Sequence, residues 1–312
     1  PPIELLFVYN SNALATAPDQ QRVRRGLARP GLFTVVFDQV LTDTACWADV
    51  VLPASTFAEH RELSRGYGAY ALQLGRPVVP AVGESRSNHE VFGALLDRLR
   101  LVRAGDPLTE DEIVAALLRV TDGPRVAREL TETGIAAPVC GANPIQFGDV
   151  FPCTPDRKVH LVPEDMDRVA PARLYGFQPD PGSERHPLAL ISPASGHRIS
   201  SSFGHLQEGP APVEISPTDA AVRGIATGDT VRIHNQLGEV HTVARISAAL
   251  RPGVVSLEKG LWSRHTLNGA TANALAPDTL ADVGGGACFN DARVEIERLG
   301  AARAVPLSAC LP

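Results

Sequence analysis

The feature that most constrains the fold is a pair of apolar runs joined by a polar, hydroxyl-rich segment. Residues 32–37 form the first run, which ends at Asp38, and residues 48–53 form the second run, which ends in proline. Short apolar runs bounded by turn residues predict buried strands. Ligands of open α/β sheets bind beyond the carboxyl ends of strands, where we expect Asp38, Thr42 and Thr44. The segment therefore predicts a crevice that suits a nucleotide.

The start of the chain has the pattern of a βαβ unit. Apolar residues 3–9 predict a strand, residues 19–28 predict a helix, and the strand that follows ends at residue 37. A crossover of this kind makes the two strands parallel neighbours. Two further helices are expected after the capping boxes Ser87–Glu90 and Thr109–Glu112.

The pattern changes in the second half of the chain. Residues 136–184 are rich in proline and predict a connection that runs over the surface. Short apolar runs between glycine or proline turns then predict strands at residues 187–192, 213–215, 230–234, 239–246 and 253–258. Such a series of short strands predicts an all-β domain, a small barrel. We therefore expect an α/β domain over 1–135, the connection over 136–184 and a barrel over 185–312.

Composition limits the class of protein. The 312 residues are 44% hydrophobic and 21% charged, which is typical of a globular chain that can bury a core. The formal net charge is -6, and acidic and basic residues are interspersed. The sequence therefore has no basic face, and no nucleic-acid partner is expected. Apolar runs are much shorter than the roughly 20 residues that cross a bilayer, so no membrane span is expected.

The cysteines and the first residues give two further expectations. Five cysteines, at positions 46, 140, 153, 288 and 310, lack the spacing of an iron–sulfur or zinc site, so no metal ligand is assigned in this chain. The chain begins with proline and has no basic or apolar leader pattern, which predicts an interior cut or a processed end.

Motifs in both halves resemble one enzyme family. The second half resembles the double-psi β-barrel at the C-terminal end of molybdopterin oxidoreductases of the dimethyl sulfoxide reductase family. Its motifs lie at residues 213–220, 224–233, 235–238 and 251–255. The first half resembles the dinucleotide-binding α/β domain that precedes the barrel in that family. Those motifs lie at residues 8–12, 42–54 and 83–88.

The resemblance covers almost the whole chain but only about the C-terminal half of a typical family enzyme. It implies a parallel-sheet α/β dinucleotide-binding domain followed by an all-β double-psi barrel. The implied cofactor is bis(molybdopterin guanine dinucleotide) with molybdenum or tungsten, and any iron–sulfur cluster would lie only in the N-terminal half. That half is the implied partner, together with an electron-transfer partner. A cytoplasmic location is expected, and a periplasmic one stays open.

Polar side chains at the ends of the first two strands are candidates for cofactor binding. Asn10 and Asn12 can donate to and accept from a purine or ribose, and an Asx turn is the alternative. Asp38 can accept two hydrogen bonds from ribose or guanine, and a solvated strand-end acid is the alternative. The resemblance implies that Phe37 and Asp38 contact the guanine nucleotide. Thr42, expected beyond the same strand end, is a further candidate for cofactor binding.

Three more candidates also have structural alternatives. Asp49 either binds cofactor or caps the turn before the second apolar run. His60 stands where several family members carry a lysine near the pterin or phosphate, so its charge depends on pH. Asn88 aligns with a family position that is often aspartate and binds guanine, or is only the first residue of a capped helix.

The second half contributes a loop, two asparagines and a tryptophan. Residues 192–204 combine hydroxyls, a guanidinium and backbone donors that suit a pyrophosphate and a polar pterin ring, and a serine-rich solvent loop is the alternative. The candidates in this loop are Ser192, His197, Arg198, Ser200 and Ser201. By resemblance, Asn273 and Asn290 contact the cofactor, and Trp262 lines the substrate funnel, unless it packs in the barrel core.

The leading hypothesis is the C-terminal portion of a molybdenum or tungsten oxidoreductase that positions its cofactor for two-electron chemistry. No catalytic residue is assigned, and the isolated chain is not expected to be active. The alternative is a stand-alone nucleotide- or cofactor-binding module, or a scaffold subunit, without turnover. Formate, nitrate, sulfoxides and sulfur oxyanions all stay open as substrates, because small changes around a site redirect its chemistry.

Overall fold

The computed structural model describes residues 2–66, 68–107, 109–120, 123–161, 164–169, 182–281 and 284–301. These residues form two compact units. Unit 1 comprises the described residues within Pro1–Val51 and Asp165–Pro312, and unit 2 comprises those within Leu52–Glu164. Cys310 and the prolines at positions 163, 171, 179 and 181 lie outside the described residues.

Unit 1 begins with the predicted βαβ pattern. Its elements are β1 (Leu5–Tyr9), α1 (Ala13–Thr16), α2 (Gln20–Leu27), β2 (Phe33–Asp38), the 3-10 helix η1 (Ala45–Trp47) and β3 (Val50–Pro53), which runs on into unit 2. β1 and β2 are parallel, with Leu5 opposite Phe33 and Tyr9 opposite Phe37, as the crossover predicts. The sheet order is β1-β2-β3. Both strand ends therefore meet at one edge of the sheet, just before α1 and η1.

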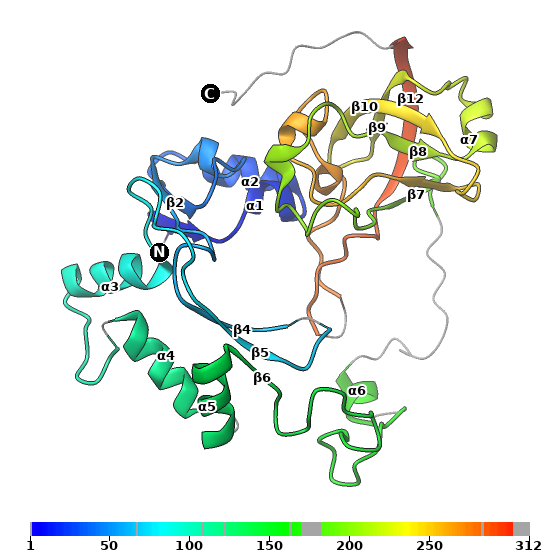
Figure 1. Ribbon diagram of the computed structural model, residues 1–312. Coiled ribbons are helices and arrows are strands. Elements are labelled where there is room, and N and C mark those ends of the chain that lie inside the picture. Colours follow the sequence, from blue (N-terminus) through cyan, green and yellow to red (C-terminus); the bar gives the residue numbers. More distant parts are fainter. Residues whose placement is uncertain are drawn as a thin grey trace. The chain divides into compact units, whose positions relative to one another are not determined.

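The rest of unit 1 is a closed barrel (Figure 1). Its strands are β7 (Leu188–Ile191), β8 (Val213–Ile215), β9 (Asp229–His234), β10 (Glu239–Ile246), β11 (Val254–Ser256) and β12 (Arg293–Ala301), in the order β10-β8-β11-β7-β12-β9. The β8–β10 and β7–β11 pairs are parallel, and the β9–β10, β8–β11, β7–β12 and β9–β12 pairs are antiparallel. Alternating side chains such as Val231, Ile233 and Ile296 point inward and are almost fully buried. The expected all-β barrel is confirmed.

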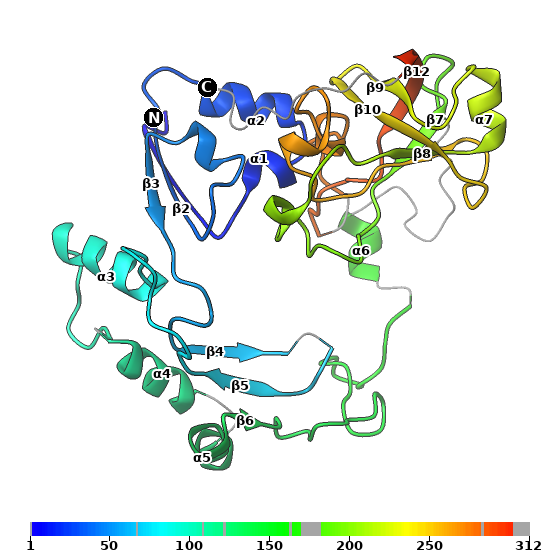
Figure 2. The same cartoon turned by 45° about the horizontal axis from the view of Figure 1, so that its top comes forward.

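Among the described residues from 182 onward, four short helices connect the barrel strands. They are η2 (Gly204–Leu206), α7 (Pro217–Val222), η3 (Ser263–His265) and η4 (Ala272–Ala274). α1 and α2 of the α/β part lie beside the segment that carries η3 and η4 in both views of the molecule (Figure 2). The backbone N–H of Asp19 donates to the carbonyl of Ala276 at 3.0 Å, which ties the start of α2 to the end of this segment.

Unit 2 has its own small core. Its elements are β4 (Glu62–Arg65), β5 (Leu72–Gly75), α3 (Asn88–Arg98), α4 (Glu110–Arg119), α5 (Pro124–Thr133) and β6 (Ile135–Ala136). The three strands form an antiparallel sheet, and Leu74, Val114, Val126, Leu130 and Ala136 make up the buried cluster. Both predicted capping boxes are present, at Ser87–Glu90 and Thr109–Glu112. The helix α6 (Glu164–Val169) lies within the proline-rich connection, at the boundary where the chain returns to unit 1.

Two expectations about strands need correction. The second apolar run forms β3, but Val50 and Val51 are each 38% exposed, because β3 is an edge strand of the three-stranded sheet. The strands β4, β5, β6 and β12 were not predicted. For β12 a signal exists, since Val294 and Ile296 alternate with charged residues as in a half-buried strand. Among the described residues, no helix is both long enough and apolar enough to cross a bilayer.

Candidate functional site

Asn12 lies in the turn between β1 and α1, and its side chain is almost fully buried. Its Oδ1 accepts hydrogen bonds from the backbone N–H of Thr44 at 3.2 Å and from the Thr44 hydroxyl at 3.0 Å. These partners are 32 residues away, so the local Asx turn is not what holds this side chain. Its Nδ2 is buried and has no hydrogen-bond partner in the described part of the chain. Because an unpaired buried donor costs about 1–3 kcal/mol, this amide suits an acceptor atom of a ligand.

The other strand-end candidates gather around the same edge. Asn10 is exposed, and its N–H donates to the carbonyl of Phe37 at 3.4 Å, which joins the ends of β1 and β2. The Phe37 ring is fully buried. Asp38 is half-buried and its Oδ1 accepts from the N–H of Gln39 at 2.7 Å, while burial raises the pKa of this carboxyl. The Thr42 hydroxyl accepts from the N–H of Ala45 at 3.1 Å and so starts η1.

Asp49 has a structural role in this fold. Its Oδ2 accepts from the N–H of Thr34 at 2.7 Å, and its own N–H donates to the Thr34 carbonyl at 2.9 Å. This exchange pairs the start of β3 with β2. The carboxylate thus binds the backbone of β2, a structural role other than the expected cap of the preceding turn, and its role toward a cofactor stays a prediction.

Amide and carboxylate side chains join the α/β part to the barrel within unit 1. Asn273 donates from Nδ2 to the carbonyl of Ala15 at 2.7 Å, and the Oε1 of Gln20 accepts from the N–H of Thr271 at 2.9 Å. Asp43 accepts from the N–H of Ser263 at 2.8 Å, and burial raises the pKa of its carboxyl. Sequence reasoning missed Gln20 and Asp43. Asp43 stands between the two threonines of the polar segment, which was the available signal.

The loop after β7 brings a buried arginine into the barrel. The Arg198 side chain is 2% exposed, and its Nη2 donates to Oε2 of Glu258 at 2.5 Å. Its Nε and Nη1 have no partner among the described residues. The N–H of Ser192 donates to Oδ1 of Asn290 at 3.1 Å, so these two candidates do meet. His197 and Ser200 are exposed.

Trp262 occupies the interior beside this loop. Its ring is 2% exposed, and its Nε1 donates to the carbonyl of Ser201 at 2.7 Å. Its backbone N–H donates to Nδ1 of His265 at 2.9 Å. Burial, and secondly the charge of Arg198, lower the pKa of His265 to about 4, so this imidazole is neutral near pH 7. The packing role of Trp262 is observed, and a place in a substrate funnel stays a prediction.

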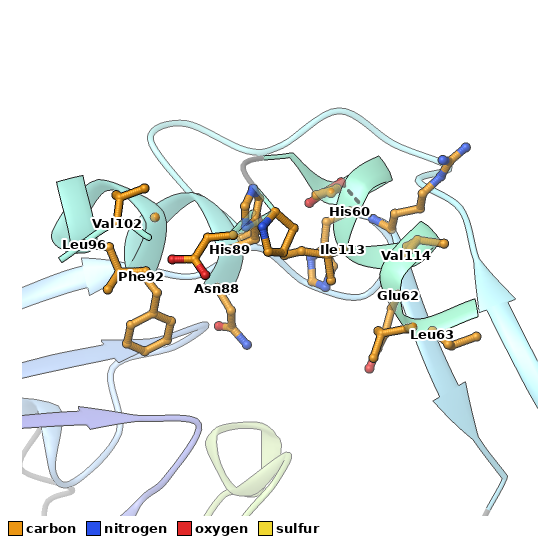
Figure 3. A pocket seen from close by; sticks show the side chains of 17 residues that line it. His60, Glu62, Leu63, Asn88, His89, Phe92, Leu96, Val102, Ile113 and Val114 are labelled. Carbon is orange, nitrogen blue, oxygen red and sulfur yellow. Dashed lines mark hydrogen bonds between the residues drawn. The ribbon is translucent and has the colours of Figure 1, made fainter. Parts of the chain in front are cut away.

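Unit 2 holds a pocket of about 600 Å³ between α3, α4 and the segment that leads into β4 (Figure 3). His60 and Asn88, which are 28 positions apart, both line it. The Nδ1 of His60 lies 2.8 Å from the hydroxyl of Ser55. Asn88 is the first residue of α3, as its structural alternative expects, and its side chain extends on the same side as Phe92 (Figure 3). These two candidates are thus brought together within unit 2.

The chemistry of these side chains is that of binding. Among the residues that the structure describes, no three His, Cys, Asp or Glu side chains are placed to hold a metal ion. What the fold presents is buried hydrogen-bond donors at Asn12 and Arg198 and an acceptor at Asp38. A parallel α/β sheet with such groups at its strand ends, followed by a barrel domain with a buried guanidinium, offers the donors and acceptors that a polar ligand requires.

Comparison with known proteins defines the family. The molybdopterin oxidoreductase family model matches residues 2–98, and the molydopterin dinucleotide binding domain model matches residues 189–293. The probable oxidoreductase YoaE of Bacillus subtilis is 33% identical over 308 residues, which cover 96% of this chain and 45% of that protein. The dimethyl sulfoxide/trimethylamine N-oxide reductase of Cereibacter sphaeroides is 26% identical over 84% of this chain and 36% of that protein.

A solved structure shares the fold. Acetylene hydratase from Pelobacter acetylenicus superposes with a TM-score of 0.71 at 19% identity and covers 95% of this chain and 44% of that one. The chain thus spans less than half the length of these relatives. It belongs to the molybdopterin oxidoreductases of the dimethyl sulfoxide reductase family and corresponds to their C-terminal region. The predicted family is confirmed, as is the order of a parallel-sheet α/β region followed by a closed β-barrel.

Proposed function

We propose that this chain binds and positions bis(molybdopterin guanine dinucleotide), with molybdenum or tungsten, in a two-electron oxidoreductase. When bound, the metal centre supplies the redox step, commonly oxygen-atom or hydride-equivalent transfer. The observation that carries the proposal is the unpartnered, buried Nδ2 of Asn12 at the strand-end edge, in a chain of this family. The chain's own residues bind and orient the cofactor, and the partner is the N-terminal half of the enzyme.

The residues of unit 1 fit the two polar parts of such a cofactor. Asp38 offers two acceptor oxygens, which match the N1–H and 2-amino donors of guanine. The Nδ2 of Asn12 offers a donor to a purine or ribose acceptor. In the barrel, Arg198 has two unpartnered donors that match phosphate or pterin oxygens. The fit is therefore one of complementary donors and acceptors at each position.

Calorimetry with nucleoside monophosphates tests the guanosine contact. We expect the chain to bind GMP more tightly than IMP, because inosine lacks the 2-amino donor that Asp38 accepts from. Asp38→Ala should bind both weakly and equally, whereas Asp156→Ala, which changes an exposed acid in unit 2, should behave as the wild type. Equal affinity of the wild type for GMP, IMP and AMP would exclude a guanine site at Asp38.

Metal and pterin analysis of the natural polypeptide tests the wider function. The expected result is molybdenum or tungsten together with a guanine-derived pterin after acid release. A purified polypeptide that binds GMP but contains neither metal nor pterin would instead support a nucleotide-binding module without turnover.

A further inference from the structure

Arg198 is buried with only one ionic partner in the described part of the chain. Its guanidinium has five N–H donors in a rigid plane, and only Nη2 is engaged, by Oε2 of Glu258 at 2.5 Å. Nε and Nη1 are buried and have no hydrogen-bond partner among the residues described. Since a buried charge without a partner is strongly destabilising, the contact with Glu258 decides how this plane is held.

The backbone around Glu258 is fixed against the arginine loop. The N–H of Leu257 donates to the carbonyl of Ile191 at 3.1 Å, and the N–H of Lys259 donates to the carbonyl of Pro193 at 3.0 Å. These bonds continue the parallel β7–β11 pairing to both sides of Glu258. The carboxylate therefore reaches Arg198 from a rigid strand end, although its own side chain is 42% exposed.

The neighbouring imidazole does not take over this role. His265 lies fully buried, accepts at Nδ1 from the N–H of Trp262, and is neutral above about pH 5 because its pKa is lowered to about 4. It neither compensates the charge of Arg198 nor competes for Glu258. Among the described residues, Glu258 is thus the carboxylate that orients the guanidinium.

We propose that Glu258 is a positioning residue, which holds Arg198 so that its Nε and Nη1 face the phosphate or pterin oxygens of a cofactor bound at residues 192–204. This inference rests on the proposed function. It adds a residue outside the predicted binding set, and it assigns to a half-exposed carboxylate a role in geometry and not in contact with the cofactor.

Anion selectivity of the chain tests the proposal, with inorganic pyrophosphate and sulfate as probes. Glu258→Gln removes the ionic contact and leaves only a neutral amide acceptor for Nη2 of Arg198. The change also raises the local positive charge, so anion affinity alone is ambiguous. A guanidinium plane that is held less firmly should lower the preference for pyrophosphate over sulfate. We expect about a tenfold loss of this preference, the effect of one charged hydrogen bond. Glu258→Asp should restore part of it. Unchanged selectivity in Glu258→Gln would overturn the proposal.

Two controls separate positioning from general effects. Glu214→Gln breaks a comparable pair in the same barrel, where Oε1 of Glu214 accepts from Arg245 at 2.7 Å, and should leave selectivity unchanged. In an Arg198→Gln background, Glu258→Gln should have no further effect, because it acts through Arg198. An additional loss there would show that Glu258 binds the anion itself and would also overturn the proposal.

A second measurement remains informative if Glu258→Gln is poorly folded. Arg198 should resist modification by phenylglyoxal in the wild type and in Glu214→Gln. In the folded Glu258→Asp variant, Arg198 should react at a rate between that of the wild type and that of an exposed arginine. Peptide analysis identifies the modified residue. Equal protection in Glu258→Asp and the wild type would contradict the positioning role. If the wild type shows no preference between the two anions, the cofactor assignment of the loop fails together with this inference. If the wild type prefers pyrophosphate and Glu258→Gln keeps the same preference, only the role of Glu258 is refuted.

Discussion

Asn273 donates from Nδ2 to the carbonyl oxygen of Ala15 at 2.7 Å, across 258 positions of the chain. The contact joins η4 of the barrel to α1 of the α/β part. Gln20 makes a second tie, since its Nε2 donates to the Leu14 carbonyl at 2.9 Å while its Oε1 accepts from Thr271. An asparagine expected to contact the cofactor therefore also holds together the two parts of unit 1.

Removing this amide should destabilise unit 1. Asn273→Ala leaves the Ala15 carbonyl without its partner, and we expect the free energy of unfolding to fall by about 1–3 kcal/mol. Urea unfolding followed by circular dichroism measures the change. Asn143→Ala, which alters an exposed asparagine of unit 2, serves as the control and should be neutral. Equal stabilities of both variants would show that the Asn273 tie contributes nothing measurable.

Alanine substitutions at two glycines distinguish the cost of a steric clash from the cost of backbone strain in the barrel domain. Gly260 and Gly253 both have positive φ, at 75° and 83°. A Cβ on Gly260 would lie 1.7 Å from the carbonyl oxygen of Ser200, whereas a Cβ on Gly253 meets nothing within 4 Å. Gly253→Ala should cost about 1–2 kcal/mol from backbone strain alone.

Gly260→Ala should lower the unfolding free energy by about 1–3 kcal/mol more than Gly253→Ala, because it also displaces the Ser200 backbone. Thermal unfolding of the two variants gives the difference. The same displacement should increase hydrogen exchange in the loop around Ser200 for Gly260→Ala alone. Equal unfolding free energies of Gly260→Ala and Gly253→Ala would show that the Ser200 backbone moves aside at no measurable cost.

The buried imidazole predicts a loss of stability in acid. His265 has a pKa of about 4 in the folded chain against 6.5 for the ordinary group. Between these values the unfolded chain binds a proton that the folded chain does not, so stability falls as pH drops from 6.5 to 4, by up to about 3 kcal/mol. His265→Asn keeps an acceptor for the Trp262 N–H and removes the titration. The difference in unfolding free energy between the wild type and the variant should therefore narrow as the pH falls through this range. A constant difference would contradict the lowered pKa of His265.

Asp43 should make stability depend on pH in the opposite direction to His265. Burial raises the pKa of its carboxyl above the ordinary value of 3.8, against the hydrogen bond from Ser263 and the charges of Arg264 and Arg24. The folded chain then holds a proton that the unfolded chain has lost, so the contribution of Asp43 to stability falls as pH rises through the window above 3.8. Asp43→Asn keeps an acceptor for Ser263 and should flatten this part of the profile. A steeper profile in the variant would refute the raised pKa.

Much of the local structure follows from residue patterns. Hydrophobic runs with polar ends predicted the parallel β1–β2 pair, and both capping boxes start their helices as expected, because these features depend on neighbours within a few residues. Short apolar runs between glycine or proline turns likewise predicted the first five strands of the barrel, β7 to β11. β4 and β5 were missed because each has only four residues, which is too short for the single apolar residue of β4 or the two leucines of β5 to establish a strand pattern.

The candidate site was predicted as a set of residue types and not as a set of partners. Asn12, Asp38 and Thr42 do share one edge of the sheet, since the ends of parallel strands must meet there. Sequence alone did not show that Asp49 binds Thr34. Thr34 belongs to β2, whereas Asp49 lies 15 positions further along the chain, directly before β3. The domain boundaries drawn from sequence also differ from the two compact units, since residues 1–51 pack with the barrel that lies far along the chain.

The sequence by itself determined the family, the α/β-then-barrel order and the residue types at each strand end, because these depend on local pattern and on motifs of fixed spacing. Only the tertiary structure decided which polar groups are satisfied within the protein. It showed that the Nδ2 of Asn273 is already engaged, that Asn12 and Arg198 keep unpartnered donors, and that Glu258 stands against Arg198. The physical reason is that burial and hydrogen-bond partners arise from chain segments up to 258 positions apart, which no local pattern records.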